Sequence, residues 1–573
     1  DAPDVPDLVD TVGAGDAFSS VLCLGMVAGW DRETTLLRAT DLAAEVCRQQ
    51  GATDTDLSVY DQHLRSWAEL PRRRPGTHAD RGLRILSLSV HGLVRGREIE
   101  LGRDADTGGQ VSYVVDQARA LAGHPDVEQV HLVTRLVEDR NVDASYAEPR
   151  EELAPGATLV RLPFGPRRYL HKESLWPYLD SLLDELTHWV RDQEQLPDVI
   201  HGHYADAGYV GAQISKLLGI PFVFTGHSLG RIKKARLLAR GRTPEQLEER
   251  YNIRRRIEAE EQALEAADLV ITSTRHEVQE QYEGYDHYVP SRMEIIPPGV
   301  DLTRFSPPSR FWVEPPFAAE LRRFLDDPAK PMVLALARPD ERKNFLTLVQ
   351  AYAETPGLRD KANLVLIAGN RDDIAELPAP QRRVLQEILV AIDRYDLYGR
   401  VAYPKHHDTD DVPEIYRLAA RSRGVFVNPA LTEPFGLTLI EAAAVGLPVV
   451  ATNDGGPRDI LEACRHGVLV DPMDAEEMGE AILRSVSEPV TWARRSKSAV
   501  SRVHSSFSWQ SHARRYVEAV DEVLSGTRPN PVHHRPSRLP LVDRVLLTDM
   551  DETLTGDMEA LAELTDRIHR ARD

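Results

Sequence analysis

The sequence predicts an α/β protein with two consecutive parallel-sheet domains. Short apolar segments alternate with longer amphipathic patterns from residue 82 to 308, and the alternation returns from 309 to 525. This rhythm is typical of βαβ units, in which a crossover helix returns the chain to the same edge of a sheet. The segment EIIPPGVDLTRFSPP (294–308) interrupts the rhythm with prolines and marks the crossing between the domains. We therefore expect two doubly wound halves facing each other across a cleft.

Each domain contains short runs that we expect to be buried strands, because they are apolar and end in turn residues. In the first domain these runs are RGLRILSLSV (81–90), HLVTR (131–135), DVIHGH (198–203), PFVFTGH (221–227) and DLVITST (268–274). In the second they are PMVLALARPDERKN (331–344), NLVLIAGN (363–370), VAYPKH (401–406), VFVNPA (425–430) and LPVVATN (447–453). Helical patterns lie between them, for example at 110–122 and 178–193, and a last one covers 509–525.

Shorter pieces flank the two domains. Residues 1–66 form one block with helical patterns at 15–28 and 31–50, and a Pro-rich linker at 67–81 separates it from the first domain. A second linker, 526–541, precedes a strand-and-loop pattern at 542–573. Both ends look cut, so we expect them to be partial α/β fragments.

The composition is that of a globular protein with a strong acidic balance. The formal net charge is −21, which opposes binding to nucleic acid and to anionic membranes. There are three cysteines without metal-site spacing, and the apolar run 21–28 is too short to span a bilayer and lacks a preceding basic segment. We expect a cytoplasmic protein.

The most informative segment is NPALTEPFGLTLIEAAAVGLPVVATNDGGP (428–457), which reads as a loop, a helix, a buried strand and a Gly-rich loop. A helix start offers unpaired N–H groups that suit a phosphate, here from Phe435, Gly436, Leu437 and Thr438. Glu433 and Glu441 lie on either side of this start, where carboxylates can accept hydrogen bonds from hydroxyls. A nucleotide sugar has this combination of phosphates and hydroxyl-rich rings.

A second cationic element follows the first strand of the same domain. Arg338 and Lys343 lie in LARPDERKN at the C-terminal end of that strand, where open α/β sheets bind ligands. Two cations five residues apart around a turn can clamp a diphosphate and neutralise the charge that builds on it as it leaves.

The first domain carries a glycine pair, strand-end histidines and basic clusters. Gly108 and Gly109 lie between a strand-end loop and a helix, where backbone N–H groups can approach a ligand. HGHYADAG (201–208) and TGHSLGRIKKARL (225–237) each end a strand with histidine, and we favour His227 as the functional one. Most of the clustered cations are expected to be solvated and paired with nearby Glu residues.

These motifs resemble the donor-site signature of retaining glycosyltransferases with GT-B architecture. The resemblance implies that Arg338 and Lys343 bind the diphosphate, that Glu441 binds the ribose hydroxyls, and that Glu433 contacts the transferred sugar. It implies that His227 contacts the donor sugar near the reacting centre. The catalytic set would then be His227, Arg338, Lys343 and Glu433, with Gly108, Gly109, Phe435, Gly436, Leu437, Thr438 and Glu441 completing the donor site.

The acceptor side narrows the resemblance. LWPYL, YADAG, TGHSLG and RRIEAEE…VITST resemble the sucrose-phosphate synthase family, over about residues 82–525. The resemblance implies UDP-glucose as donor and fructose 6-phosphate as acceptor, with retention at the glucose C1 and sucrose 6-phosphate as product. The implied acceptor contacts are Gln110, Lys172, Tyr204, Ser228, Lys233, Arg254 and Arg256. Because neither donor segment, 331–344 or 428–457, contains an Asp-x-Asp motif, we expect no metal or other cofactor in the transfer step.

The end fragments carry motifs of their own. DTVGAGDAF (10–18) resembles the signature of PfkB sugar kinases, which implies an anion hole at Gly13, Ala14 and Gly15 and a base at Asp16. DMDET (549–553) resembles the first motif of HAD-type sucrose-phosphate phosphatases, which implies Asp549 as nucleophile, Asp551 as acid/base and Thr553 within the motif. Mg²⁺ would bind Asp549 and Asp551 only in a complete phosphatase domain. The implied partners include the missing kinase and phosphatase portions of a parent polypeptide.

Several alternatives stay open at this stage. Within the same class, the chain would be a sucrose synthase that uses free fructose or a mannosylfructose-phosphate synthase that uses GDP-mannose. The residues do not fix the base as uracil, adenine or guanine. From other classes, the chain would be a sugar kinase or phosphatase with the middle as a scaffold, or a regulatory sugar-phosphate-binding protein without turnover.

Overall fold

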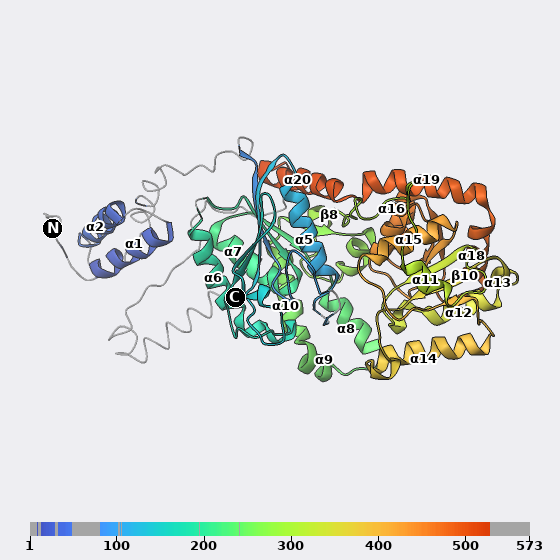
Figure 1. Ribbon diagram of the computed structural model, residues 1–573. Coiled ribbons are helices and arrows are strands. Elements are labelled where there is room, and N and C mark those ends of the chain that lie inside the picture. The colour runs from blue at the N-terminus through green and yellow to red at the C-terminus, as the bar shows by residue number, and fades with distance from the viewer. Residues whose placement is uncertain are drawn as a thin grey trace. The chain divides into compact units, whose positions relative to one another are not determined.

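The computed structural model describes residues 9, 13–28, 32–48, 63, 81–100, 103–104, 106–193, 195–239 and 241–527 (Figure 1). The chain divides into two units. One contains α1 (Ala14–Ala28) and α2 (Arg32–Val46), which pack through Val21, Ala39 and Leu42. The other contains two β-sheets, each with its own helices. Within the described ranges, no helix combines the length and apolar character that a bilayer crossing requires.

The first lobe is built on an eight-stranded sheet in the order β3-β4-β2-β1-β5-β6-β7-β8, in which β3 alone is antiparallel to its neighbour. The strands are β1 (Leu83–Leu88), β2 (Val127–Arg135), β3 (Arg150–Ala154), β4 (Ala157–Leu162), β5 (Val199–His203), β6 (Phe222–Thr225), β7 (Leu269–Thr272) and β8 (Met293–Ile295). Its helices are α5 (Gly109–Ala122), α6 (Leu179–Arg191), α7 (Tyr204–Leu218), α8 (Gly230–Ala239), α9 (Pro244–Tyr251) and α10 (Ile253–Ala266).

The second lobe is built on a six-stranded parallel sheet in the order β11-β10-β9-β12-β13-β14. The strands are β9 (Met332–Leu336), β10 (Asn363–Ile367), β11 (Val401–Ala402), β12 (Val425–Asn428), β13 (Val449–Thr452) and β14 (Gly467–Val470). Its helices are α11 (Phe317–Arg322), α12 (Phe345–Glu354), α13 (Leu358–Lys361), α14 (Ala379–Arg394), α15 (Asp411–Arg421), α16 (Leu437–Val445), α17 (Pro457–Cys464), α18 (Ala475–Ser487) and α19 (Pro489–Ser506).

Short helical turns complete both lobes. They are η1 (Ala144–Ala147), η2 (Lys172–Ser174), η3 (Trp176–Tyr178), the π-helical η4 (Glu277–Gln281), η5 (Pro290–Arg292), η6 (Glu341–Lys343) and η7 (Ile374–Glu376). Three of them, η2, η3 and η6, carry residues of the sites described below.

The second sheet is buried on both faces, as a parallel sheet requires. Along β9, Met332 and Leu334 belong to the core on one face, while Val333 and Ala335 belong to the core on the other. The near-continuous apolar sequence of this strand follows from that double burial. The α/β class and the two Rossmann-like domains predicted from the sequence are confirmed.

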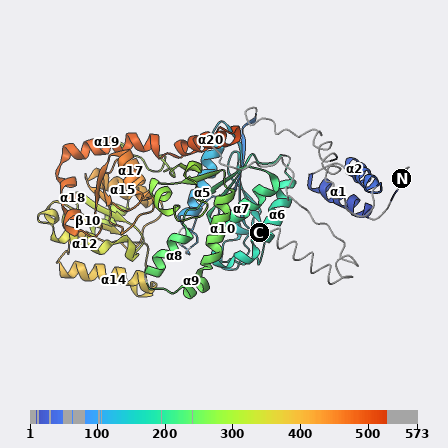
Figure 2. The ribbon, with the colours of Figure 1, turned by 180° about the vertical axis from the view of Figure 1, so that it is seen from behind.

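The last described helix, α20 (Trp509–Ser525), packs on the first lobe beside α5 (Figures 1 and 2). Ala513, Tyr516 and Val517 are part of the first lobe's core. The sequence analysis placed residues 309–525 in the second domain because the chain order alone gives no sign of this return. Where the chain passes back, Val300 and Ser508 form a bridge and the Val300 N–H donates to the Phe507 carbonyl at 2.8 Å.

The sequence analysis did not identify β3, β4, β8 and β14. The strand β3 is mostly polar and partly exposed, with the sequence REELA, so it lacks the buried apolar run that marked the other strands. Likewise, β2 begins at Val127, whereas the sequence predicted a start at His131, because the polar residues Glu128 and Gln129 interrupt the apolar pattern at the beginning of the strand. The predicted helix at 509–525 matches α20, and 110–122 matches α5 within one residue.

Candidate functional site

The candidate residues follow the C-terminal ends of strands in both sheets. In the second sheet, β9 has β10 on one side and β12 on the other, so the connections from β9 and β12 leave in opposite directions. Such a switch point is where open α/β sheets hold ligands. Lys343 follows β9 and Glu433 follows β12, which brings them together across this point.

Lys343 and Glu433 form an ion pair at the switch point. The Lys343 Nζ lies 2.7 Å from Glu433 Oε2, and Asn428 Nδ2 donates to the same oxygen at 3.2 Å. The lysine side chain is 32% exposed and the glutamate 12%, so the pair is open to a ligand from one side. Arg338, also predicted for this site, is exposed at the start of the same loop.

The Gly-rich loop after β13 fixes the position of Glu433. The Glu433 N–H donates to the Asp454 carbonyl at 3.1 Å, and its carbonyl accepts from the Gly456 N–H at 2.9 Å. A Cβ on Gly455 would lie 2.2 Å from the Glu433 carbonyl oxygen, so this approach requires glycine. The GGP sequence therefore holds the backbone of Glu433 in place.

The helix α16 begins at Leu437, as the anion-site prediction required. Its N-cap, Gly436, has φ of 109° and makes no side-chain cap, so the first N–H groups of the helix, on Leu437 and Thr438, have no capping side chain. Phe435 is half-buried in the preceding turn, with its ring 6.3 Å from that of Phe507. An exposed helix start of this kind favours an anion.

Glu441 lies one turn into α16 and is held by Tyr416. The Tyr416 hydroxyl donates to Glu441 Oε2 at 3.0 Å. Burial raises the pKa of Glu441 to about 7, against the opposing effects of the Tyr416 hydrogen bond and the charge of Arg304. Glu441 is thus poised to exchange a proton or a hydrogen-bond partner when a polar ligand binds.

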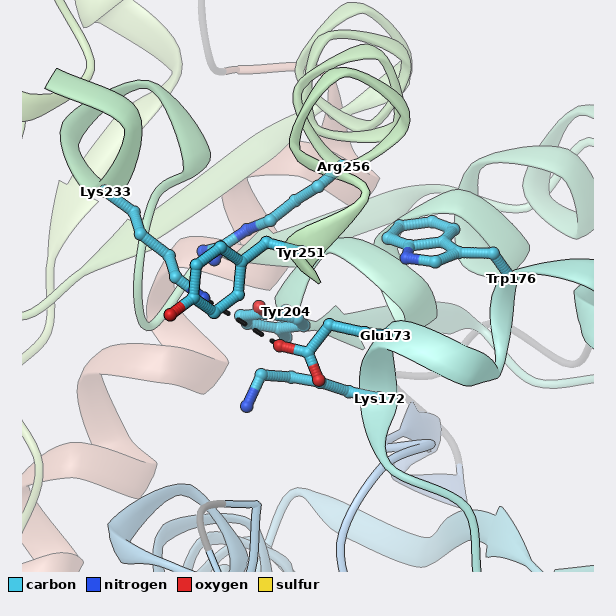
Figure 3. Close-up of a pocket in the computed structure, with 7 residues that line it drawn as sticks. All are labelled: Lys172, Glu173, Trp176, Tyr204, Lys233, Tyr251 and Arg256. Atoms are coloured by element: carbon cyan, nitrogen blue, oxygen red, sulfur yellow. Dashed lines mark ion pairs between the residues drawn. The ribbon is translucent and has the colours of Figure 1, made fainter. Parts of the chain in front are cut away.

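The first lobe contains a small basic pocket (Figure 3). Its lining combines three cations from three different elements with aromatic rings and one carboxylate. The residues are Lys172, Glu173, Trp176, Tyr204, Lys233, Tyr251 and Arg256. Four of the seven predicted acceptor residues, Lys172, Tyr204, Lys233 and Arg256, are brought together here.

Lys172 is anchored by a buried aspartate. Its Nζ forms an ion pair with Asp106 Oδ1, and its backbone N–H donates to Asp106 Oδ2 at 3.0 Å. Burial tends to raise the pKa of Asp106, but the hydrogen bond from Lys172 and its charge outweigh burial and lower it. The carboxylate therefore stays ionised and holds the lysine at the pocket.

Lys233 is the least satisfied cation of the pocket. The Glu173 Oε1 lies 3.8 Å from its Nζ, beyond hydrogen-bond distance, and the ammonium lies 3.8 Å from the centre of the Tyr251 ring. Burial and then the neighbouring charge of Arg256 lower the pKa of Lys233 to about 8. The pocket thus has excess positive potential at this ammonium group.

Arg256 forms the buried wall of the pocket. Its Nε lies 2.9 Å from Glu260 Oε1, and its Nη2 donates to the Ser228 carbonyl at 2.6 Å. The guanidinium carbon lies 4.6 Å from the centre of the Tyr204 ring. Glu260 in turn accepts from the Gly230 N–H at 2.9 Å, which ties α10 to the start of α8. Ser228 therefore contacts Arg256 both through its carbonyl and through its Oγ, which accepts from the Arg256 Nη2 at 3.3 Å.

Two predicted acceptor residues lie elsewhere. Arg254 is exposed and lines a separate groove between α8, α9 and α10, and its N–H donates to Glu248 at 3.0 Å. Gln110 lies in the first turn of α5, and its Nε2 is buried without a partner among the described residues. Beside it, a Cβ on Gly108 or Gly109 would meet nothing within 4 Å, so this backbone borders open space.

His227 follows β6 in a left-handed backbone conformation, with φ of 54°. Its Nε2 lies 3.0 Å from the Nδ1 of His203, which ends β5. Burial lowers the pKa of His227 to about 3, with a further contribution from His91, so the ring is neutral. The two strand-end histidines predicted from the sequence therefore lie in direct contact.

Sequence reasoning missed several residues that complete these sites. They are Asp106, Glu173, Trp176, Tyr251 and Glu260 in the first lobe, and Tyr416 and Asn428 in the second. Trp176 lies in the LWPYL motif and Asp106 in DADTGG, so both signals were present in the quoted segments. Tyr416 lies on α15 and gave no local sign of contact with α16. Within the described ranges, no group of three or more His, Cys, Asp or Glu residues is placed to hold a metal ion.

The motifs of the end fragments are described in part. Gly13 has φ of 86°, and its carbonyl accepts from the Ala17 N–H at 2.9 Å, so α1 begins at Ala14 within the Gly-Ala-Gly-Asp sequence. Gly15 and Asp16 lie in the first turn of that helix. The phosphatase-like residues Asp549, Asp551 and Thr553 lie outside the described residues.

Family comparisons agree with this arrangement. The family described as "Glycosyl transferases group 1" matches residues 318–501, and "Glycosyltransferase Family 4" matches residues 107–304. The family "pfkB family carbohydrate kinase" matches residues 2–58. The two lobes thus have GT-B architecture and each matches a glycosyltransferase family, while the segment before them matches a sugar-kinase family.

Curated relatives of this chain include sucrose-phosphate synthases of plants. The chain is 45% identical over 554 residues to sucrose-phosphate synthase 4 of Arabidopsis thaliana, covering 84% of this chain and 53% of that protein. It is 47% identical over 511 residues to sucrose-phosphate synthase of Zea mays, covering 77% of this chain and 47% of that protein. The chain therefore spans about half the length of the curated relatives it matches.

Solved structures share the fold. Sucrose-phosphate synthase from Thermosynechococcus elongatus is 28% identical with a TM-score of 0.59, covering 78% of this chain and 100% of that one. The Anabaena protein HepE in complex with UDP-glucose is 17% identical with a TM-score of 0.51, covering 77% of this chain and 100% of that one. The second likeness concerns the fold alone.

Proposed function

We propose that this chain transfers glucose from UDP-glucose to fructose 6-phosphate, giving sucrose 6-phosphate and UDP with retention at the glucose C1. The proposal rests on the similarity to sucrose-phosphate synthases over most of this chain. It rests also on a cationic site in each lobe, one suited to a sugar phosphate and one to a diphosphate.

The observation that carries the choice of acceptor is the state of Lys233. Its ammonium is half-buried, has a carboxylate oxygen only at 3.8 Å, and has a pKa lowered by burial and by Arg256. A phosphate monoester would supply two negative charges and several acceptor oxygens at this point, which satisfies the ammonium protons. Free fructose would offer only hydroxyl groups and would leave the positive potential uncompensated. The pocket therefore favours a phosphorylated acceptor.

The donor is assigned to the switch point of the second lobe. Arg338, Lys343 and the start of α16 would bind the diphosphate, because they bring positive charge and N–H donors to one edge of the sheet. Glu441 would accept hydrogen bonds from the ribose hydroxyls, which would replace the hydrogen bond that it now accepts from Tyr416. Glu433, oriented by Lys343 and Asn428, would accept a hydroxyl of the transferred glucose.

The reaction would proceed on the face from which the diphosphate leaves. The bond from glucose C1 to the diphosphate oxygen breaks as the acceptor hydroxyl oxygen bonds to C1, and the hydroxyl proton passes to the departing diphosphate. Lys343 and Arg338 would stabilise the negative charge on the leaving group. His227, as a neutral imidazole, would hydrogen-bond the glucose without adding positive charge beside the cationic C1 centre. The transfer step is proposed to need no metal.

A panel experiment tests this function. The chain is incubated with UDP-, ADP- and GDP-glucose and GDP-mannose, each with fructose or fructose 6-phosphate, and the products are identified by mass spectrometry. Sucrose 6-phosphate from UDP-glucose is the expected product. Sucrose from free fructose, or a mannosyl product, would replace the proposal with the corresponding alternative, and no product with any pair would overturn it.

Two lysine variants, Lys233→Met and its control Lys216→Met, test the assignment of the acceptor. We expect Lys233→Met to raise the KM for fructose 6-phosphate about 10- to 100-fold, the equivalent of one charge-assisted hydrogen bond, with little change in the KM for UDP-glucose. Lys216→Met removes an exposed lysine of the same lobe that lies 3.8 Å from Glu265. Equal kinetics for both variants would contradict the acceptor assignment.

The end fragments extend the proposal to the parent polypeptide. The kinase-like segment would belong to a sugar kinase with Gly13, Ala14, Gly15 and Asp16 at its anion hole, supported by the family match to residues 2–58. Residues 542–573 would begin a phosphatase in which Asp549 and Asp551 bind Mg²⁺. We propose that such a polypeptide works in the cytoplasm. A longer polypeptide that carries complete kinase and phosphatase domains together with this chain should show both activities in the same protein.

A further inference from the structure

Behind His227 lies a group of buried imidazole rings that the proposed chemistry does not use. His203 ends β5, His201 lies two residues earlier in the same strand, and His512 lies on α20. All three are nearly fully buried. Four histidines, from β5, α20 and the segment that follows β6, therefore share one interior region of the first lobe.

The contact between His203 and His227 is direct and constrained. The His203 Nδ1 lies 3.0 Å from the His227 Nε2, and the two rings are stacked with centroids 5.2 Å apart. Tyr113 presents its ring edge-on to both, at 5.9 Å from His203 and 4.9 Å from His227. Neither ring can rotate freely, so the pair has a defined geometry.

One proton must lie between these two nitrogens. Burial lowers the pKa of His203 well below its usual value, and it lowers that of His227 to about 3, so both rings are neutral. Each neutral imidazole carries one N–H and one lone pair. The hydrogen bond therefore has two orientations: His203 donates through Nδ1, or His227 donates through Nε2.

The other nitrogen of His203 decides between them. Its Nε2 is buried and has no hydrogen-bond partner in the described part of the chain. A buried N–H without an acceptor is destabilising, and orphaned N–H groups are rarer in proteins than under-satisfied acceptors. The proton of His203 therefore belongs on Nδ1, where the His227 Nε2 accepts it.

The neighbouring rings obey the same rule. His201 meets Thr225 Oγ1 through Nε2 at 2.9 Å, and its Nδ1 is buried without a described partner. His512 must donate from Nδ1 to the Pro297 carbonyl at 2.8 Å, which leaves its Nε2 to accept from Gln117 at 2.9 Å. In this region each proton can lie on a nitrogen that has a partner.

We propose that His203 is a positioning residue that holds His227 in the Nδ1–H tautomer, so that His227 presents a hydrogen-bond donor, not an acceptor, to its ligand. With Nε2 occupied as an acceptor, the single proton of His227 lies on Nδ1. A hydroxyl oxygen of the transferred sugar is the class of acceptor that such a donor fits. The ligand in this statement rests on the proposed function, whereas the tautomer does not.

The tautomer is measured on the free protein. The full chain is labelled with ¹⁵N-histidine, and the His227 signals are assigned by their loss in His227→Asn. We expect a protonated Nδ1 and an unprotonated, hydrogen-bonded Nε2 at neutral pH. A protonated Nε2 on His227 would overturn the proposal. Because no substrate is needed, this result stands even if the chain transfers no sugar, which would refute the proposed function alone.

Two amide substitutions test the consequence for turnover. Asn places its amide where the His203 Nδ1 lies, and it can donate to His227; Gln places its amide near the Nε2 position and cannot. We expect His203→Asn to keep kcat within about threefold of the parent and His203→Gln to lose about 10- to 100-fold, by analogy with the loss of partners that orient metal-binding histidines. Equal losses in two variants that unfold at the parent's temperature, or no loss in His203→Gln, would contradict the role.

Discussion

Replacement of Lys343 by methionine tests the donor site most directly. The Lys343 Nζ lies 2.7 Å from Glu433, and the side chain is 32% exposed, so its charge is only partly screened by solvent. At an effective dielectric constant of about 20, an ammonium about 4 Å from a unit negative charge contributes about 4 kcal/mol. Partial exposure places the effect at the lower end of the range for one stabilising donor, about 2.7–4 kcal/mol or 10²–10³-fold in kcat.

The same substitution should affect folding less than turnover. The pair is partly buried, with side-chain exposures of 32% and 12%, but Glu433 keeps its hydrogen bond from Asn428, so we expect the free energy of unfolding to fall by about 1–2 kcal/mol. Initial rates with UDP-glucose and fructose 6-phosphate give kcat and KM, and urea denaturation gives the free energy of unfolding. Lys361→Met is the matched control, since Lys361 ends α13 just before the N-terminal end of β10, away from the strand ends that carry Lys343, and its Nζ donates to the Ser487 hydroxyl at 3.0 Å. A kcat within threefold of the parent for Lys343→Met would refute the donor assignment.

Three further outcomes follow from buried or close-packed groups. Arg256→Met should lower the free energy of unfolding by about 3–5 kcal/mol, because it leaves Glu260 buried without its charged partner. In urea denaturation, the double variant Arg256→Met/Glu260→Gln should recover more than half of that loss. A loss below 1 kcal/mol in the single variant would contradict this expectation. Burial raises the pKa of Glu441 from 4.5 to about 7, so its contribution to stability is complete below pH 4.5 and is lost as the pH rises through 7. The unfolding free energy of Glu441→Gln relative to the parent should therefore increase by up to about 3 kcal/mol between pH 4.5 and 8, whereas parallel pH curves would count against the raised pKa. Gly108→Ala should leave the melting temperature within about 2 °C of the parent's, because the added Cβ meets nothing within 4 Å. It should nevertheless raise the KM of a substrate that approaches this backbone about tenfold. An unchanged KM for both substrates would remove Gly108 from the site.

The sequence by itself determined the architecture and the local parts of each site. Apolar runs followed by Gly-, Pro- or His-containing turns located ten strands, because a parallel strand must be apolar on both faces and end at a turn. The switch-point pair was accessible for the same reason: Lys343 and Glu433 each follow a strand end, and strand ends of a parallel sheet meet at one edge. Local features of a helix could be predicted equally well, such as the start of α16, which has no capping side chain.

Only the tertiary structure decided which side chains from distant segments form hydrogen bonds and ion pairs with one another. The partners of Lys172 and Glu441 are Asp106 and Tyr416, which lie on other segments, whereas the i,i+4 pair of Arg256 with Glu260 within α10 is of the kind expected from the sequence. The return of α20 to the first lobe and the pairing of His203 with His227 depend on packing between distant segments. A periodic pattern records that a side chain is buried, but not what it is buried against, because the hydrophobic effect that creates the pattern has no direction. Hydrogen bonds and ion pairs do have direction, and their partners are fixed only when the lobes are packed.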